Sequence, residues 1–223
     1  MFEMITNGSV TDPKGFKAAG IHANIKKKKK DMALIFSDYP CSAARTFTLN
    51  KVKAAPILLS QYLINQKSKV RAILINSGNA NACTGQQGYN DALETQSYLA
   101  QKTGINQSEV LVSSTGVIGE KLPMDKMLAG IDSVIPQLSY TGGIDAAEAI
   151  MTTDITMKNF AAKVKLSGGE VTIGCICKGS GMIMPNMATM LAFVTTDAII
   201  EQYLLQRMLS ESVNLSFNRI SVD

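Results

Sequence analysis

One threonine lies where a glycine-containing segment meets an apolar stretch late in the chain. The region reads Lys178-Gly-Ser-Gly-Met-Ile-Met-Pro-Asn-Met-Ala-Thr189-Met-Leu-Ala-Phe193. Glycines allow the backbone to fold back tightly, and the small side chain of Ala188 leaves its carbonyl group accessible. We therefore predict that Thr189 is a nucleophile, which first cuts the Ala188–Thr189 peptide bond and then accepts an acyl group.

The composition restricts the base that could activate this threonine. His22 is the only histidine, which disfavours a Ser–His or Cys–His catalytic unit. A free α-amine has a pKa of roughly 7.7–8.0 and can take the hydroxyl proton, but Thr189 gains this amine only when the chain is cut before it. Threonine is also common in ordinary strands. The residues alone therefore leave open whether Thr189 is a nucleophile or simply part of a strand.

Thr115 and Gly116 form a second candidate feature. They follow the apolar run Val110–Ser114 and therefore stand at the end of a predicted strand. One hydroxyl beside one unhindered backbone N–H could make an oxyanion hole, which stabilises the negative charge of an acyl-transfer transition state. An ordinary turn at the end of a strand is the alternative.

The segment Asn76–Gly85 is small, polar and rich in Asn and Gly, so it predicts a loop with positive φ angles and exposed N–H groups. It follows an apolar strand and precedes a predicted helix, which is a common way to present donors to an anion. The segment matches neither the dinucleotide-binding motif G-x-G-x-x-G nor the phosphate-binding motif G-x-x-x-x-G-K-[ST], so nucleotide binding is weakly supported.

Charge and aromatic content disfavour nucleic acid as a partner. The 223 residues are 46% hydrophobic and 18% charged, which is typical of a globular protein, and the net charge is only +4. The run Lys26–Lys30 is interpreted as a solvated loop or hairpin tip. Tryptophan is absent and aromatic residues are few, so stacking surfaces for single-stranded nucleic acid are not expected.

The cysteines indicate free thiols and no metal site. Cys175 and Cys177 are two residues apart and would share one face of a strand, but with a single histidine they make a poor zinc site. Cys41 and Cys83 complete the set, and all four are expected to be buried thiols in a reducing cytosol. No apolar stretch approaches the length needed to span a bilayer, so a cytoplasmic protein without membrane contact is predicted.

Hydrophobic periodicity predicts interspersed strands and helices, hence a mixed sheet with helices outside it. Strands are expected at 32–36, 45–49, 70–75, 110–114, 158–166, 171–177, 191–193 and 218–223. Helices are expected at 54–66, 90–102, 124–138, 146–151 and 198–217, the last capped by Thr195–Asp197, and 18–20 reads as a loop. Because the chain stops inside an expected strand, it is interpreted as a fragment of something longer.

Several segments together resemble the ornithine acetyltransferase (ArgJ) family, the glutamate N-acetyltransferases of arginine biosynthesis. Lys178–Leu191 is similar to the segment in which this family cuts itself, and Asn76–Gly85 is a second specific match. The other matching segments, in the family's order, are Pro13–Gly20, Lys53–Pro56, Ser114–Gly119, Thr152–Asp154 and Phe217–Ile220. The resemblance covers essentially the whole chain.

The resemblance implies a division of the chain and a set of roles. Residues 1–188 would form the α-chain region, and 189–223 the truncated start of the β-chain region. Thr189 would carry the acetyl group, with Thr115 and Gly116 as the oxyanion hole. Thr152, Lys178 and Thr189 would contact substrate, where the Lys178 cation suits a carboxylate and would lower the pKa of the Thr189 amine.

The family further implies substrates, assembly and fold. The acetyl group would pass from N-acetylornithine to glutamate, with no cofactor, although some members also accept acetyl-CoA as donor. The chains would assemble as an α2β2 heterotetramer with a DmpA/ArgJ-like fold, an α+β or α/β layered sandwich of mixed β-sheets packed between helices. Members continue beyond this chain, so part of the pocket is expected to lie outside it.

Two other functions remain open at this stage. The first is an aminopeptidase or amidohydrolase of the same fold, which would use water as the acceptor. The second is an inactive truncated subunit that only folds or pairs.

Overall fold

The strands form two four-stranded sheets. The computed structural model describes residues 2–66, 68–179 and 190–220. Its strands are β1 (Phe2–Ile5), β2 (Phe16–Ile21), β3 (Met32–Cys41), β4 (Val70–Asn79), β5 (Val110–Val117), β6 (Lys158–Leu166), β7 (Gly169–Lys178) and β8 (Leu191–Thr196). The mixed sheet has the order β2-β3-β4-β5, in which only β4 and β5 are parallel, and the antiparallel sheet has the order β1-β6-β7-β8.

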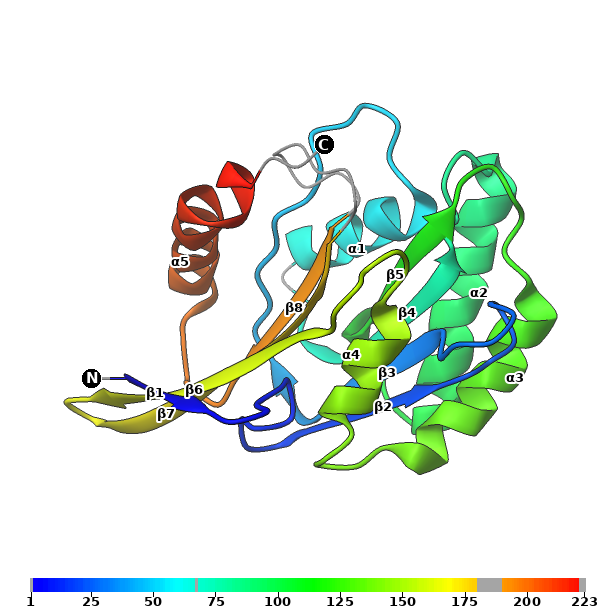
Figure 1. Ribbon diagram of the computed structural model, residues 1–223. Coiled ribbons are helices and arrows are strands. Elements are labelled where there is room, and N and C mark those ends of the chain that lie inside the picture. The colour runs from blue at the N-terminus through cyan, green and yellow to red at the C-terminus, as the bar shows by residue number, and fades with distance from the viewer. Residues whose placement is uncertain (1, 67, 180–189, 221–223) are drawn as a thin grey trace.

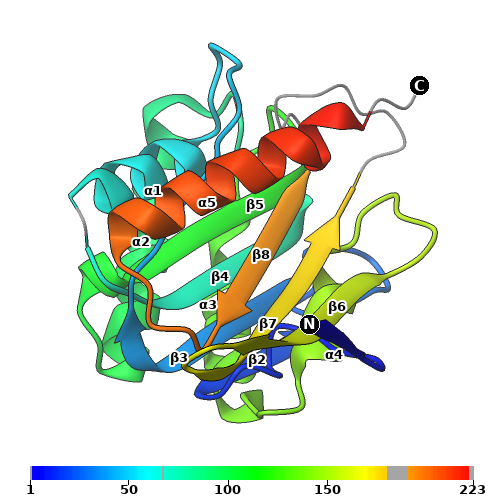
Figure 2. The same ribbon diagram turned by 90° about the vertical axis from the view of Figure 1, so that its left-hand side faces the viewer.

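The helices lie mainly against the mixed sheet. They are α1 (Ala55–Asn65), α2 (Gly85–Thr103), α3 (Met124–Val134), α4 (Gly143–Ile150) and α5 (Gln202–Leu215), with single 3-10 turns η1 (Gln107–Glu109), η2 (Ile135–Gln137) and η3 (Phe217–Arg219). Figure 1 shows α2 and α3 on one side of the mixed sheet and the antiparallel sheet with α4 toward the other. Figure 2 shows the antiparallel sheet from its outer side, in front of the mixed sheet.

Adjacent residues of β4 supply two different cores. Leu74 packs with Leu99 of α2 and Ile131 of α3 on one face, while Ile75 packs with Ile150 of α4 and Ile176 of β7 on the other. Side chains alternate across a strand, so a central strand buried on both faces reads as a continuous apolar run. The second core holds the two sheets and α4 together, and the candidate site lies beside it.

The layered arrangement and most elements agree with the sequence prediction. The strands at 32–36, 70–75, 110–114, 158–166, 171–177 and 191–193 and all five helices are confirmed, with different ends. The two cysteines of β7, Cys175 and Cys177, occupy alternate positions of one strand as expected. All four cysteines are free, but only Cys177 is buried: Cys41 and Cys175 are half-buried and Cys83 is exposed, so the expectation that all four are buried is wrong.

Three local predictions are wrong. Segment 18–20 is not a loop but part of β2, and its small residues let α4 approach: a Cβ on Gly20 would lie 1.9 Å from the Asp145 carbonyl oxygen. Segment 45–49 is not a strand, because the Arg45 backbone N–H and C=O bond to the Gln206 side chain instead of a neighbouring strand. The start of the last predicted strand, Asn218–Arg219, lies in η3, and 221–223 lie outside the described residues.

The cap predicted for α5 is also wrong. Glu201 is the N-cap, and its carboxylate accepts a hydrogen bond from the Leu204 N–H. Asp197 is already engaged, since it accepts from the N–H groups of Lys14 and Thr172 and so ties the end of β8 to β7 and to the N-terminal loop.

Two wider expectations concern membranes and metals. Within the described ranges, no helix has the length and apolar character needed to cross a bilayer. In the same part of the chain, no group of three or more His, Cys, Asp or Glu side chains is arranged to hold a metal ion.

Candidate functional site

Three segments that are distant in sequence meet at the side chain of Lys178. Its Nζ lies 2.8 Å from the Thr152 Oγ1 and 3.2 Å from the Thr115 Oγ1, with the ammonium donating to both hydroxyls. Lys178 is 3% exposed and Thr115 is 8% exposed. Three of the predicted site residues therefore meet at one buried cation, which hydrogen-bonds to both threonines.

The fold explains why these residues meet. Thr115 is near the carboxyl end of β5 in the mixed sheet, and Lys178 is the last residue of β7 in the antiparallel sheet. Thr152 follows α4, which packs between the two sheets. Two strand ends and one helix end therefore converge at one edge of the shared core.

The surroundings of the Lys178 ammonium disfavour its charged form. Burial lowers the pKa of the Lys178 ammonium below its ordinary value, the Asp154 carboxylate opposes this shift, and the Lys158 cation adds to it. The ammonium has three donors, and described residues take two of them. The third donor is suited to a carboxylate or another acceptor of a bound molecule.

The Lys178 contact also orients the Thr115 hydroxyl. A hydroxyl that accepts from an ammonium turns its own proton away from that cation, and is polarised by it. The Thr115 O–H is thus available to donate to a separate oxygen atom. Together with the backbone of Gly116, this matches the chemistry expected of an oxyanion hole.

Gly116 has a backbone conformation and a contact that other residues would not tolerate. Its φ is +139°, and a Cβ there would lie 2.3 Å from the carbonyl carbon of Gly78, its partner across the parallel β4–β5 pair. Gly78 also has a positive φ of 106°. Two glycines thus bring the ends of β4 and β5 together directly beside Thr115 in the chain.

Asp154 was missed as a site residue from the sequence. Its carboxylate accepts from the Gly179 N–H at 2.8 Å, the Lys158 Nζ at 2.8 Å and the Thr152 N–H at 3.3 Å, and its side chain is 1% exposed. Burial alone would raise the pKa of this carboxyl, but the three hydrogen bonds and the Lys158 charge outweigh it and hold the pKa below its usual value. The signal in the sequence was a lone carboxylate directly after Thr152-Thr153.

The Asn76–Gly85 segment is built differently from the expected exposed loop. β4 continues to Asn79, and the side chains of Asn76, Asn79 and Asn81 are buried. Asn76 accepts from the Ser114 hydroxyl at 2.6 Å, and Asn79 donates to the backbone of residues 120 and 121. The predicted positive φ angles do occur, at Gly78, Asn81, Cys83 and Gly85. The asparagines therefore serve mainly to shape the chain.

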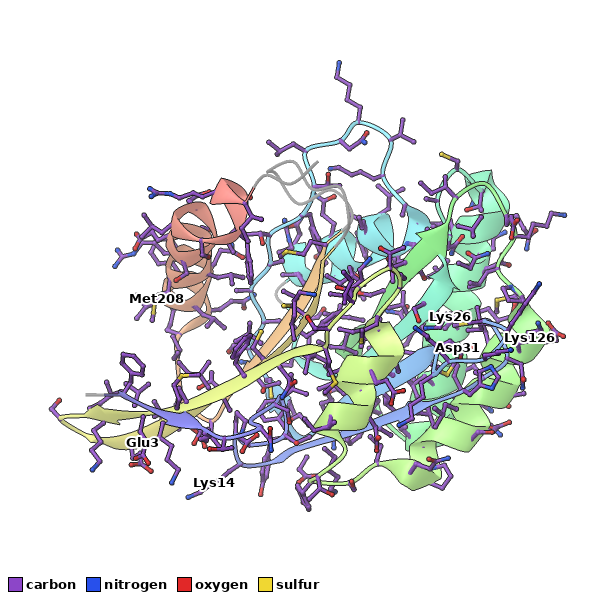
Figure 3. The ribbon with its side chains drawn as sticks, viewed as in Figure 1. Glu3, Lys14, Lys26, Asp31, Lys126 and Met208 are labelled. Carbon is purple, nitrogen blue, oxygen red and sulfur yellow. The ribbon has the colours of Figure 1, made fainter. Side chains whose placement is uncertain are left out.

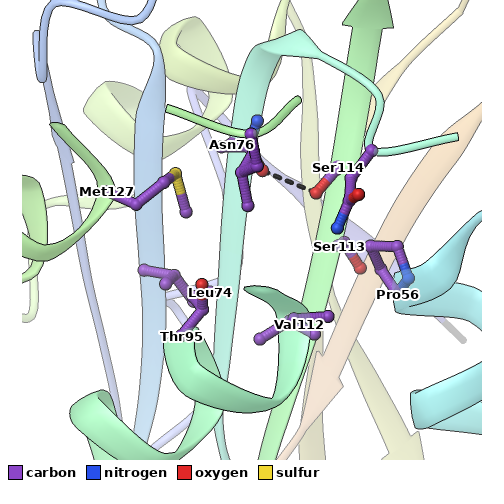
Figure 4. Close-up of a pocket in the computed structure, with 11 residues that line it drawn as sticks. Pro56, Leu74, Asn76, Thr95, Val112, Ser113, Ser114 and Met127 are labelled. Carbon is purple, nitrogen blue, oxygen red and sulfur yellow. Dashed lines mark hydrogen bonds between the residues drawn. The ribbon is translucent and has the colours of Figure 1, made fainter. Parts of the chain in front are cut away.

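A small cavity is lined by residues of β4, β5, α2 and α3, among others. Its volume is about 10 Å³, and Figure 4 shows Asn76, Thr95 and Ser114 among the polar side chains that line it. A space of this size suits one water molecule and no substrate. Its lining includes none of Thr115, Thr152 and Lys178.

The basic run Lys26–Lys30 is a hairpin connection, as predicted, but not all of it is solvated. Lys26 Nζ donates to the Met151 carbonyl at 3.0 Å, and Asp31 accepts from the Lys26 N–H at 2.7 Å. Figure 3 shows Lys26, Asp31 and Lys126 gathered at this connection. Lys30 forms ion pairs with Asp145 and Glu148 of α4. This connection thereby holds the end of α4, directly before Thr152.

Two predicted residues, Ala188 and Thr189, lie outside the described residues. The described chain resumes at Met190, which is buried, and continues into β8. Leu191 pairs with Lys178 across the β7–β8 ladder. The chain therefore leaves the Lys178 cluster after Gly179 and returns to the same end of the antiparallel sheet.

Comparison with known proteins gives consistent results. A model of the ArgJ family matches residues 17–223. The chain is 52% identical over 219 residues to the arginine biosynthesis bifunctional protein ArgJ of Symbiobacterium thermophilum, covering 97% of this chain and 54% of that protein. The chain thus spans about half the length of the curated relatives it matches.

Solved structures agree with the sequence relatives. The crystal structure of the arginine biosynthesis bifunctional protein argJ from Bacillus halodurans matches with a TM-score of 0.80 and 44% identity, over 84% of this chain and 98% of that one. The ornithine acetyltransferase of Mycobacterium tuberculosis complexed with ornithine matches with a TM-score of 0.77 and 40% identity, over 84% of this chain and 100% of that one.

Proposed function

This chain belongs to the ArgJ family, and from this premise we propose that its protein transfers an acetyl group from N-acetylornithine to glutamate in arginine biosynthesis. The observation that carries the proposal is the convergence of Thr115 and Thr152 on the buried Lys178 cation. The Lys178 cation would bind an anionic group of the substrate, and the Thr115 hydroxyl would stabilise an oxyanion. Lys178 is the last residue of β7, and the segment containing Thr189 lies between β7 and β8 in the sequence.

Sequence position supports Thr189 as the nucleophile at this site. Leu191 is the strand partner of Lys178 in the β7–β8 pair. Thr189 precedes Leu191 by two positions in the sequence.

The first step of the proposed mechanism is self-cleavage. The Thr189 Oγ attacks the Ala188 carbonyl carbon, the C–N bond breaks, and an ester to Oγ replaces the amide. Water then hydrolyses the ester, which leaves a carboxylate on Ala188 and a free α-amine on Thr189. This amine is the base that the single-histidine composition otherwise lacks.

The second step is transfer of the acetyl group. The amine takes the Oγ proton as Oγ attacks the acetyl carbonyl, and the oxyanion is held by the Thr115 hydroxyl and the Gly116 N–H. The C–N bond then breaks, the proton goes to the leaving amine of ornithine, and the acetyl group remains as an ester on Thr189. The amine of glutamate attacks the ester carbonyl carbon, the C–Oγ bond breaks, a proton passes from the attacking amine to Oγ, and N-acetylglutamate leaves.

The lengths of the matched chains also support a cut at this position. The aligned share of this chain, 84% of 223 residues, is about 187 residues and fills 98% of the Bacillus halodurans chain. That solved chain is therefore close in length to the segment that ends at Ala188. The curated relatives, by contrast, are about twice as long as this chain.

The proposal extends to assembly and location. Residues 1–188 would be the α chain, and Thr189 the first residue of a β chain that continues beyond 223, with two copies of each in a cytoplasmic heterotetramer. No cofactor is needed for the steps above. Acetyl-CoA would enter only as an alternative acetyl donor.

The dependence of ornithine release on glutamate, the acetyl acceptor, separates an acetyltransferase from an amidohydrolase. The full-length protein is incubated with N-acetylornithine, with and without glutamate, and ornithine and N-acetylglutamate are measured. We expect ornithine release to require glutamate beyond one turnover and to match N-acetylglutamate formation. Rapid ornithine release that ignores glutamate would indicate an amidohydrolase, and no release in either arm would indicate an inactive subunit.

A further inference from the structure

The geometry points to Asp154 as a positioning residue, whose carboxylate clamps the Thr152 turn to the end of β7 and thereby fixes the Lys178 ammonium against Thr115. The inference rests on the proposed function for its catalytic consequence. Its structural content, the placement of Lys178, is independent of any reaction.

The clamp consists of contacts on both sides of Lys178. One Asp154 oxygen, Oδ1, accepts from the Gly179 N–H, which directly follows Lys178 in the chain. The other, Oδ2, accepts from the N–H of Thr152, the residue whose hydroxyl receives the shorter Lys178 hydrogen bond. One carboxylate therefore fixes both the chain that carries the lysine and the turn that carries its acceptor.

The environment of Asp154 shows that this contact is not a surface feature. Its side chain is 1% exposed, and a buried carboxylate is costly unless it is paired and hydrogen-bonded. Lys158 of β6 supplies the pairing charge at 2.8 Å, and its side chain is 39% exposed. Asp154 thus carries a balancing charge for Lys158 and, at longer range, for Lys178.

The hydrogen bond between Asp154 and the Gly179 N–H also lies close in sequence to the proposed cleavage site before Thr189. Gly179 is the last described residue before the segment 180–189. A carboxylate that holds its N–H fixes the backbone directly after β7. Loss of this contact should therefore affect self-cleavage as well as acetyl transfer.

Asp197 offers a matched control. It is another carboxylate that accepts from two backbone N–H groups, those of Thr172 and Lys14, and Thr172 lies toward the other end of β7 from Lys178. Asp197→Ala removes the same kind of bridge without touching the Lys178 cluster. Lys158→Gln is a second control, because it removes the exposed partner charge and leaves both backbone contacts of Asp154 in place.

The test uses the full-length protein and its Asp154→Ala, Asp154→Asn, Asp197→Ala and Lys158→Gln variants. The first readout is the rate at which Lys178 is modified by reductive methylation, measured by peptide mass spectrometry in the folded protein. The second is kcat/KM for acetyl transfer, with urea unfolding as the measure of stability. Lys178 is buried in the wild type, so its methylation should be slow.

We expect Asp154→Ala to raise the methylation rate of Lys178 at least roughly tenfold and to lower kcat/KM at least roughly 100-fold, in line with the loss caused by misplacing a catalytic group. Asp154→Asn keeps one acceptor oxygen for Gly179 and should recover part of both effects. Asp197→Ala should leave the methylation of Lys178 unchanged within about twofold. Lys158→Gln removes a cation that lowers the pKa of Lys178, so it should not raise the methylation rate.

Two outcomes would overturn the inference. One is unchanged Lys178 methylation in folded Asp154→Ala and Asp154→Asn proteins. The other is a loss of activity that follows stability equally in Asp154→Ala and Asp197→Ala. If the wild type transfers no acetyl group, the proposed function fails, while the methylation rates still decide whether Asp154 positions Lys178. Should Asp154→Ala not fold, Asp154→Asn gives the same two readouts.

Discussion

The Lys178 Nζ lies 3.2 Å from the Thr115 Oγ1 and joins the last residue of a strand in the antiparallel sheet to a strand end in the mixed sheet. The two residues are 63 positions apart in sequence. The bond fixes the direction of the Thr115 hydroxyl, because its oxygen is occupied by the ammonium and its proton is turned elsewhere. The proposed catalytic roles depend on this one contact between the sheets.

Thr115→Val tests the oxyanion role of the hydroxyl. Valine keeps the branched shape that suits β5 and replaces the hydroxyl by a methyl group, which also removes one acceptor of Lys178. We expect acetylation of the enzyme to slow by roughly 10²–10³, measured in a single turnover with N-acetylornithine. Thr115→Ser keeps the hydroxyl and should lose much less. An unchanged rate in Thr115→Val would remove Thr115 from this role.

Gly116→Ala tests the close approach of β4 and β5. A methyl group there would overlap the Gly78 backbone, and the φ of +139° is unfavourable for alanine. We expect a loss of more than about 1 kcal/mol in the free energy of urea unfolding. Gly168→Ala is the control, because nothing lies near its added methyl group. Equal stability of the two variants would contradict the packing described for this strand pair.

Lys178→Met tests the buried charge through pH. Burial lowers the pKa of Lys178 in the folded protein, so between this pKa and the ordinary lysine value the unfolded chain binds more protons. The free energy of unfolding of the wild type should therefore rise with pH across this window. Lys178→Met should show a smaller rise, with the remainder due to Lys26, whose pKa burial also lowers. The exposed-site variant Lys28→Met should keep the full rise. Identical pH profiles for the wild type and Lys178→Met would show that Lys178 is not buried as described.

Lys26→Met tests the contact between the β2–β3 connection and α4. The amine of Lys26 caps the carbonyl of Met151 at the end of this helix, where a cation is favoured. We expect Lys26→Met to lower the free energy of unfolding by up to about 2 kcal/mol. Lys28→Met removes the same charge from an exposed position and should change it by less than about 0.5 kcal/mol. A similar loss in both variants would restore the interpretation of the whole run as solvated.

The residues predicted for the site were chosen by their types and by the segments that resemble the ArgJ family. Lys178, Thr115 and Thr152 do meet, although no local pattern indicated that they would. Periodicity located the core strands, since β4 and β5 are apolar runs buried in the interior. It failed at 45–49, where the Gln206 side chain replaces a strand partner.

Long-range contacts explain what the sequence did not reveal. Asp154 looked like the last residue of a short polar turn, and only the fold places its carboxylate against Gly179, 25 positions later. Lys26 looked like one of five equivalent lysines until the hairpin placed its amine on the end of α4. Segment 18–20 looked like a loop because the packing of α4 requires small residues in β2.

The most direct test of the account is whether the full-length protein cuts itself before Thr189. Intact mass and N-terminal sequencing of the purified wild type should give two polypeptides, the second of which begins with Thr189. Thr189→Ala should give one uncut chain, and Thr189→Ser, which keeps a hydroxyl, should still be cut. A single uncut species in the wild type, or a cut that Thr189→Ala does not abolish, would contradict Thr189 as the nucleophile.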